Sequence, residues 1–179
     1  MYICSQLRSF VPILNFEIKM NIQPIQNKYE NEIVDLILNI QQKEFNVPVT
    51  LEDQPDLLDI ENFYFKPGGT FLGAFIEGKL VGTIALVKFN DEAAAIRKMF
   101  VKKEYRGKEF QIAQQLLEQL IAYSKENGIK NLYLGTVTIL QAALRFYEKN
   151  NFVTIAKEAL PEDFPLMKPD NVFCHLKLN

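Results

Sequence analysis

The sequence of 179 residues has the length and composition of one folded domain, with 48% hydrophobic and 12% aromatic residues. A chain of this length can bury a core large enough to fold alone. Its formal net charge of −2 argues against a general nucleic-acid binder, which would carry an excess of Lys and Arg. The two cysteines, Cys4 and Cys174, form no disulfide framework, so a reducing, cytoplasmic environment is expected.

The residues themselves argue against two further classes of protein. His175 is the only histidine and no Cys/His cluster exists, so neither a metal site nor a Ser-His-Asp triad on another histidine is expected. No apolar run approaches the ~20 residues that span a bilayer, so no membrane association is expected. Residues 1–19 are predicted to be a loose extension before Met20, and residues 20–179 a single domain.

A short strand over residues 22–25 and an amphipathic helix over 29–43 are predicted to open the domain. Apolar side chains recur in that helix at steps of three and four residues. Residues 46–67 carry several acids and three prolines, which predicts short helical turns joined by loops. Three strand-like runs separated by tight turns follow, and they predict an antiparallel meander over residues 70–76, 80–89 and 93–101.

A second helix is predicted over residues 110–126, and Asn127-Gly128 ends it. The buried run at 132–137 makes residues 93–137 a strand–helix–strand crossover, whose strands are normally parallel. A further helix and two strands complete the domain, at residues 140–149, 152–156 and 172–178. The expected fold class is α/β with a mixed sheet, and one visible parallel crossover disfavours a doubly wound nucleotide fold.

The segment from Val101 to Ala113 is the most informative for function. A strand ends, a basic turn containing Gly107 follows, and a helix begins at once. The first turn of a helix has unpaired backbone N–H groups and the positive end of the helix dipole, which together bind anions. The basic residues of this turn are Lys102, Lys103, Arg106 and Lys108. Without further knowledge, a loop with solvated lysines explains the pattern equally well, because no P-loop and no GxGxxG is present.

The segment resembles motif A of the GNAT-type N-acyltransferases, [RQ]-x-x-G-x-[GA], in the register of residues 106–111. Residues 143–152, Ala-Leu-Arg-Phe-Tyr-Glu-Lys-Asn-Asn-Phe, are similar to the family's A-x-x-F-Y-E-K-x-G-F signature. The resemblance covers residues 20–179. It implies a GNAT-like fold, with a mixed, mostly antiparallel central sheet, helices on both faces and one parallel crossover.

The chain departs from the family pattern at four positions. Glu109 and Gln111 replace small residues, and Leu140 stands where many members carry an Asn that helps to bind the cofactor. Asn151 replaces a Gly, which is a mild change because Asn tolerates the left-handed conformation. The Glu109 carboxylate is expected to face away from the pyrophosphate, where it would favour the helix N-terminus.

The resemblance implies an N-acetyltransferase that transfers an acetyl group from acetyl-CoA to a primary amine of a small molecule or peptide, as a monomer or homodimer. A backbone N–H near Met99 or Val101 would serve the thioester carbonyl, and the pantetheine arm would lie along that strand. Tyr147 matches the position of the general acid. The residues expected to bind the cofactor are Met99, Phe100, Val101, Arg106, Gly107, Lys108, Glu109, Phe110, Gln111 and Ile112.

Several assignments keep an alternative. Tyr147 lies on an amphipathic helix, where periodicity alone favours core packing over the acid role. Glu92 is the nearest candidate for a general base, but an exposed turn carboxylate is the favoured explanation. His175 is expected to be structural. Acids that would attract a cationic amine, or would only be solvated, are Glu44, Glu52, Asp53, Asp56 and Asp59.

Two other functions compete with the transferase. One is an acyl-CoA-binding module that acts as a sensor or scaffold without turnover, which Glu109 and Leu140 favour. The other is a nucleic-acid binder built on the basic turn. The net acidity and the lack of an aromatic stacking platform beside that turn argue against nucleic acid.

Overall fold

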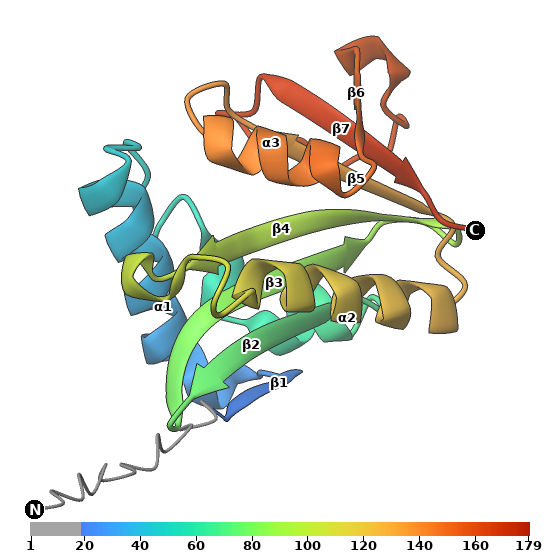
Figure 1. Ribbon diagram of the computed structural model, residues 1–179. Coiled ribbons are helices and arrows are strands. Elements are labelled where there is room, and N and C mark those ends of the chain that lie inside the picture. The colour runs from blue at the N-terminus through green and yellow to red at the C-terminus, as the bar shows by residue number, and fades with distance from the viewer. Residues whose placement is uncertain (1–18) are drawn as a thin grey trace, which may run out of the picture.

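The computed structural model describes residues 19–179. Seven strands form one sheet in the order β1-β2-β3-β4-β5-β7-β6 (Figure 1). The strands are β1 (Met20–Pro24), β2 (Thr70–Ile76), β3 (Lys79–Lys88), β4 (Ala93–Val101), β5 (Asn131–Thr136), β6 (Val153–Ile155) and β7 (Val172–Lys177). The extension predicted over residues 1–19 lies, apart from Lys19, outside the described residues and stays a prediction.

Three α-helices accompany the sheet: α1 (Glu30–Leu38), α2 (Ile112–Glu126) and α3 (Gln141–Lys149). The chain continues beyond α1 as a wider π-helical turn over Asn39–Glu44, so the apolar periodicity predicted to residue 43 belongs to two kinds of helix. Short helical turns at Pro55–Leu57 and Glu61–Phe65 confirm the prediction for the proline-rich segment.

Neighbouring strands pair in the antiparallel sense at every position except one. β1 to β4 form an antiparallel meander, and β5, β7 and β6 are antiparallel to one another. Only β4 and β5 are parallel, and α2 connects them. The prediction of a mixed sheet with one parallel crossover is therefore confirmed.

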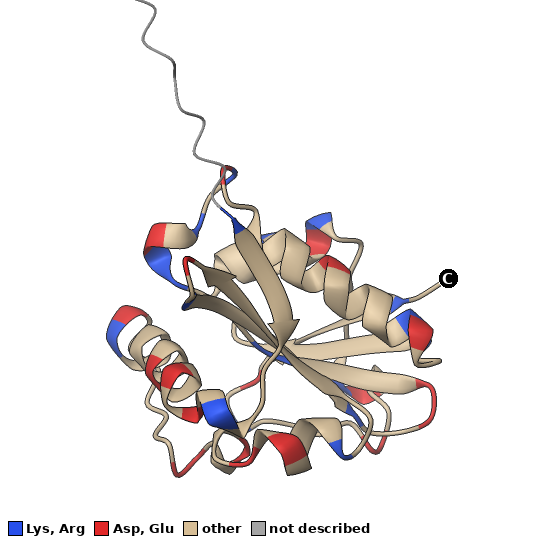
Figure 2. Ribbon diagram, turned by 90° about the horizontal axis from the view of Figure 1, so that it is seen from below, with Lys and Arg blue, Asp and Glu red and all other residues tan. Residues whose placement is uncertain are grey.

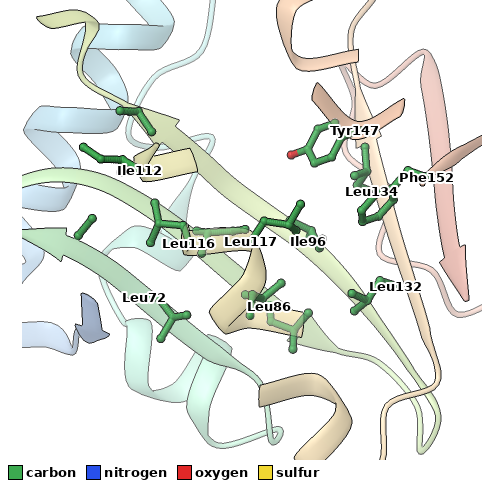
Figure 3. Close-up of a cluster of buried hydrophobic side chains, with 14 of the residues drawn as sticks. Leu72, Leu86, Ile96, Ile112, Leu116, Leu117, Leu132, Leu134, Tyr147 and Phe152 are labelled. Atoms are coloured by element: carbon green, nitrogen blue, oxygen red, sulfur yellow. The ribbon is translucent and has the colours of Figure 1, made fainter. Parts of the chain in front are cut away.

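The helices cover both faces of the sheet, because β2 alternates its side chains between two cores. Leu72 and Ala74 join the cluster beneath α2, where Leu116 and Leu117 are fully buried (Figure 3). Phe71 and Phe75 point the other way, into the cluster formed with α1 and the short turns that follow it. This arrangement confirms the predicted helices on both faces.

Charged side chains are found mostly on the helices and loops, while the strands are largely free of them (Figure 2). Within residues 19–179, no helix is both long and apolar enough to cross a bilayer. The same part of the chain holds no group of three or more His, Cys, Asp or Glu side chains arranged to bind a metal ion.

Candidate active site

β4 and β5 separate in the middle of the sheet, and the gap between them forms the candidate site. Their pairing covers only residues 93–95 and 131–133, although β4 continues to Val101 and β5 to Thr136. Figure 1 shows the two strands side by side at one end and apart at the other. One side of β4 therefore has no strand neighbour, and its backbone N–H and C=O groups need another partner.

A β-bulge in β4 lies at the same place. Between two of its pairings with β3, β4 has two residues, Lys98 and Met99, opposite the single residue Ile84. Lys98 has a φ of 51°, which is uncommon for a residue other than glycine. Its carbonyl accepts a hydrogen bond of 2.7 Å from the Thr83 hydroxyl. A bulge bends its strand and redirects the side chains, so it shapes β4 at the point where the gap opens.

A cavity of about 730 Å³ occupies the gap. Residues 96–100 of β4 form one wall, and the end of β5 with the start of α3 forms another. The remaining walls come from two loops, which contribute residues between 41 and 54 and residues 166–170. Of the residues predicted to bind the cofactor, Met99 and Phe100 line this cavity. Leu140, which stands where many family members have Asn, also lines it.

Tyr147 points from α3 toward β4 and lines the cavity (Figure 3). Its hydroxyl donates to the Met99 sulfur at 3.1 Å, and its ring packs edge-on against Phe152 at 5.3 Å between centroids. The residue is only 6% exposed, and this burial raises the pKa of its hydroxyl well above the ordinary value. The phenol therefore keeps its proton at neutral pH. Tyr147 both packs in the core and presents a polar atom to the cavity.

The basic turn lies between β4 and α2. Gly107 has a φ of 140°, which favours glycine, and Gln111 takes the left-handed conformation with a φ of 50°. Because Gln111 breaks the helical geometry, α2 begins at Ile112 and not near Phe110 as predicted. Within the described part of the chain, no backbone carbonyl accepts a hydrogen bond from the N–H groups of residues 108–110. The turn thus offers a run of consecutive unpaired donors, as an anion site requires.

Two charged residues of the turn differ from a simple phosphate clamp. The Arg106 guanidinium binds both carboxylate oxygens of Glu44, one at 2.9 Å, and also donates to the Val101 carbonyl at 2.7 Å. The Glu109 carboxylate folds back over Gly107, where a β-carbon would lie only 2.7 Å from one of its oxygens. The carboxylate thus lies over the turn itself, and the expectation that it faces away from a bound pyrophosphate stays a prediction. Its short side chain curls toward the open space left by the glycine.

A buried polar network ties the bulge to the loop on the other side of the cavity. The Lys98 ammonium lies 2.6 Å from the Gln54 side-chain oxygen and 3.2 Å from the Asp56 carboxylate. The Tyr64 hydroxyl also donates to Asp56, and Gln54 exchanges hydrogen bonds with Gln41. Burial lowers the pKa of Lys98, and the Asp56 charge opposes that change. The network satisfies the buried charges and fixes the loop against β4.

Asp170 is a second titratable residue of the cavity wall. Burial raises the pKa of its carboxyl to about 6, although the Arg97 guanidinium and a backbone hydrogen bond at Met167 act in the opposite direction. Arg97 itself donates to the Pro165 carbonyl and lines the same cavity. Sequence reasoning missed Asp170 because it belongs to no motif. Its one signal is its position in the proline-rich loop between β6 and β7.

Other predicted residues lie elsewhere. Glu92 is exposed and pairs with Lys130 at 2.5 Å, so it is not at the cavity and the structure does not support it as a base. His175 stacks on Tyr133 with 4.5 Å between ring centroids and forms a hydrogen bond with Asn131, which agrees with a structural role.

The five acids expected near a cationic amine lie in different surroundings. Glu52 and Asp53 line the cavity, Glu44 and Asp56 form ion pairs, and Asp59 accepts a hydrogen bond from Asn62. Asn151 has a φ of 66°, as its place in the helix end predicts.

Comparison with known proteins gives the class that this fold and site define. The model of the acetyltransferase (GNAT) family matches residues 34–152, and the chain belongs to this family. A crystal structure of a GNAT-family acetyltransferase from Staphylococcus aureus Mu50 is 38% identical, with a TM-score of 0.86 over 90% of this chain and 100% of that one. PaiA N-acetyltransferase from Thermoplasma acidophilum, solved in complex with coenzyme A, is 18% identical and has a TM-score of 0.65, over 89% of this chain and 99% of that one.

Relatives identified by sequence carry different substrate names. The N-acetylaspartate synthetase of Xenopus tropicalis is 37% identical over 100 residues, which are 54% of this chain and 36% of that protein. Streptothricin acetyltransferase A of Bacillus subtilis is 27% identical over 137 residues, which are 76% of this chain and 78% of that protein. The match to the first relative thus spans about a third of its length.

Proposed function

We propose that this chain is an acetyl-CoA-dependent N-acetyltransferase that acts on a primary amine of a small molecule or, less favoured, a peptide. The observation that carries the proposal is the Tyr147 hydroxyl, which lies against Met99 of β4 at the gap where β4 leaves β5. A proton donor is thereby placed beside a strand edge that has no partner. Membership of the acetyltransferase family supports the same conclusion.

The features of β4 and the turn fit coenzyme A. The N–H groups of residues 108–110 have no backbone acceptor and stand next to the start of α2, so these donors and the helix dipole together suit a diphosphate. Gly107 adds no side chain to the turn, although the Glu109 carboxylate lies over it, and Ile112 is buried and offers only its backbone. The open side of β4 around Met99 suits an extended arm that carries amide groups.

The reaction requires three contributions from the protein. A neutral amine attacks the thioester carbonyl, and the new C–N bond forms as the C–S bond breaks. A backbone N–H of β4 near Met99 or Val101 stabilises the negative charge on the carbonyl oxygen. Tyr147 gives its proton to the departing sulfur. The high pKa of Tyr147 ensures that the proton is present, and recovery of a proton from the new amide nitrogen returns the phenol to its starting state.

A small-molecule acceptor is favoured over a peptide for two reasons. The relatives named above are an N-acetylaspartate synthetase and a streptothricin acetyltransferase, whose names refer to small molecules. Loops also contribute two sides of the cavity wall, an arrangement that suits a compact acceptor. The proposal includes a cytoplasmic location, based on the low cysteine content, and a monomer or homodimer.

Replacement of Tyr147 by phenylalanine tests the proposal. With acetyl-CoA and a panel of amines, the wild type should release free thiol, and Tyr147→Phe should lower kcat by about 100-fold or more, the typical effect of a general acid. Calorimetry should show unchanged CoA affinity. Tyr29→Phe is the matched control, because its hydroxyl contacts only Gln23 among the described residues. Full activity in Tyr147→Phe would refute the acid role.

The second candidate, a CoA-binding module without turnover, is favoured by Glu109 over Gly107 and by Leu140 in the cavity wall. The same experiment separates the two. CoA binding without thiol release for any amine would establish the binding module and exclude the enzyme.

A further inference from the structure

Asp170 is held at the cavity by the backbone on both of its sides. It closes a tight turn in which its own N–H donates to the Met167 carbonyl at 3.2 Å. The next residue, Asn171, donates to the Thr136 carbonyl at 2.9 Å and accepts from the Thr138 N–H at 2.9 Å. These hydrogen bonds fix the backbone of Asp170, and therefore the position of its carboxylate, beside the end of β5.

The Asp170 carboxylate also occupies a space that only a glycine leaves open. A β-carbon built on Gly135 would lie 2.1 Å from one carboxylate oxygen and 2.6 Å from the carboxyl carbon. Such distances are far below van der Waals contact, so any other residue at position 135 would displace the carboxylate. Gly135 lies in β5 beyond the last rung of its pairing with β4 and lines the same cavity. The missing side chain of Gly135 thus leaves a space that the Asp170 carboxylate fills beside the gap between β4 and β5.

The charges around Asp170 come from several elements. Arg97 faces the cavity from β4, Lys168 lies in the same turn, and Glu52 and Asp53 come from the opposite loop. The Arg97 guanidinium donates to the Pro165 carbonyl, while the Asp170 carboxyl receives a backbone hydrogen bond at Met167. Partial burial disfavours the charged form and raises the pKa of the carboxyl to about 6, in the range useful for a base near neutral pH.

We propose that Asp170 is the general base that takes a proton from the acceptor ammonium, and that Gly135 is the residue that admits it to the cavity. This inference rests on the proposed transferase function. Asp170 accepts one proton from the ammonium, which leaves a neutral amine with a free electron pair. The amine then forms the C–N bond, the C–S bond breaks, and Tyr147 protonates the sulfur. The second nitrogen proton returns to Tyr147 through water, and Asp170 releases its proton to solvent.

The pH profile of kcat/KM for the amine tests this role. For the wild type, kcat/KM should rise with pH and reach a plateau above about pH 6. For Asp170→Asn, kcat/KM should be about 100-fold lower than for the wild type at pH 7. It should rise tenfold per pH unit between pH 6 and 8, because only the free amine then reacts. Asp170→Glu should keep the rise of kcat/KM near pH 6, with lower values throughout. Gly135→Ala should lower kcat/KM as Asp170→Asn does, although the carboxylate is still present.

Controls separate this role from structural damage. Asp163→Asn removes the same charge from the same loop, at a residue that bonds Asn90 and does not line the cavity, and should leave the profile unchanged. CoA binding by each variant, measured by calorimetry, reports the folded state. An Asp170→Asn variant that keeps the limb near pH 6, or loses activity by the same factor at every pH, would overturn the inference alone. A wild type without thiol release would overturn the transferase and this inference together.

Discussion

Replacing Asp170 by asparagine should stabilise the folded protein at neutral pH while it impairs catalysis. The folded protein holds this carboxyl at a pKa of about 6, compared with an ordinary value of 3.8. Between these values the unfolded chain releases its proton first, so the stability of the wild type falls as the pH rises from about 4 to about 6. The asparagine side chain does not ionise in this range, so the Asp170→Asn protein does not lose stability in this way.

The magnitude follows from the difference between the two pKa values. A change from 3.8 to about 6 corresponds to about 3 kcal/mol, at about 1.4 kcal/mol for each pH unit. Because the carboxyl faces an open cavity, solvent screening reduces this to about 1–2 kcal/mol. The free energy of unfolding of Asp170→Asn, relative to the wild type, should therefore rise by that amount between pH 4 and pH 7.

Urea denaturation at several pH values, without ligand, measures this difference. Asp163→Asn corrects for the loss of one negative charge, because it lies in the same loop and bonds Asn90 at the surface. Comparison across pH also cancels any constant cost of the amide in the cavity wall. A difference between Asp170→Asn and wild type that does not change with pH would refute the reasoning, because it would show that folding does not alter the affinity of this carboxyl for protons.

Three further predictions concern other parts of the chain. Lys98→Met should lower the free energy of unfolding by about 3–5 kcal/mol in urea denaturation, because it leaves the buried Asp56 charge unpaired. Adding Asp56→Asn should recover part of this loss. Equal stability of the single and double variants would contradict this reasoning. Glu109→Gln should strengthen CoA binding a few-fold at low salt and less at high salt, by calorimetry, because it removes a negative charge from the basic turn. Leu116→Ala should cost about 2–5 kcal/mol through a cavity beneath α2, and a cost below 1 kcal/mol would show that the core collapses around the gap.

The arrangement of the sheet could be predicted because it depends on local patterns. Apolar runs bounded by turn residues gave β2 and β4 at their observed limits, and the helix between two buried runs predicted the parallel pair. Tyr147 could be placed at the cavity because its motif fixes its position on α3. The start of α2 was misjudged, because nothing in the sequence shows that Gln111 takes the left-handed conformation.

The rest of the site could not be predicted, because it depends on contacts between distant segments. No motif marks Lys98, yet it is only 7% exposed, because Asp56 and Gln54 contact it from a loop more than 40 residues earlier. Asp170 lies in a loop, and its position at the cavity depends on the space beside Gly135 in β5, 35 residues earlier in the chain. No spacing rule in one sequence links such partners.

The separation of β4 from β5 also has a consequence for solubility. Sheets are usually protected at their outer edges by charges, prolines or short strands, since an exposed edge can recruit another extended chain. Here an unprotected edge lies in the middle of the sheet, and the loops that contribute residues 41–54 and 166–170 to the cavity wall stand on either side of it. These loops flank the unpaired part of β4, so they hinder its pairing with another extended chain. Shortening these loops to admit larger acceptors would therefore expose an aggregation-prone strand edge.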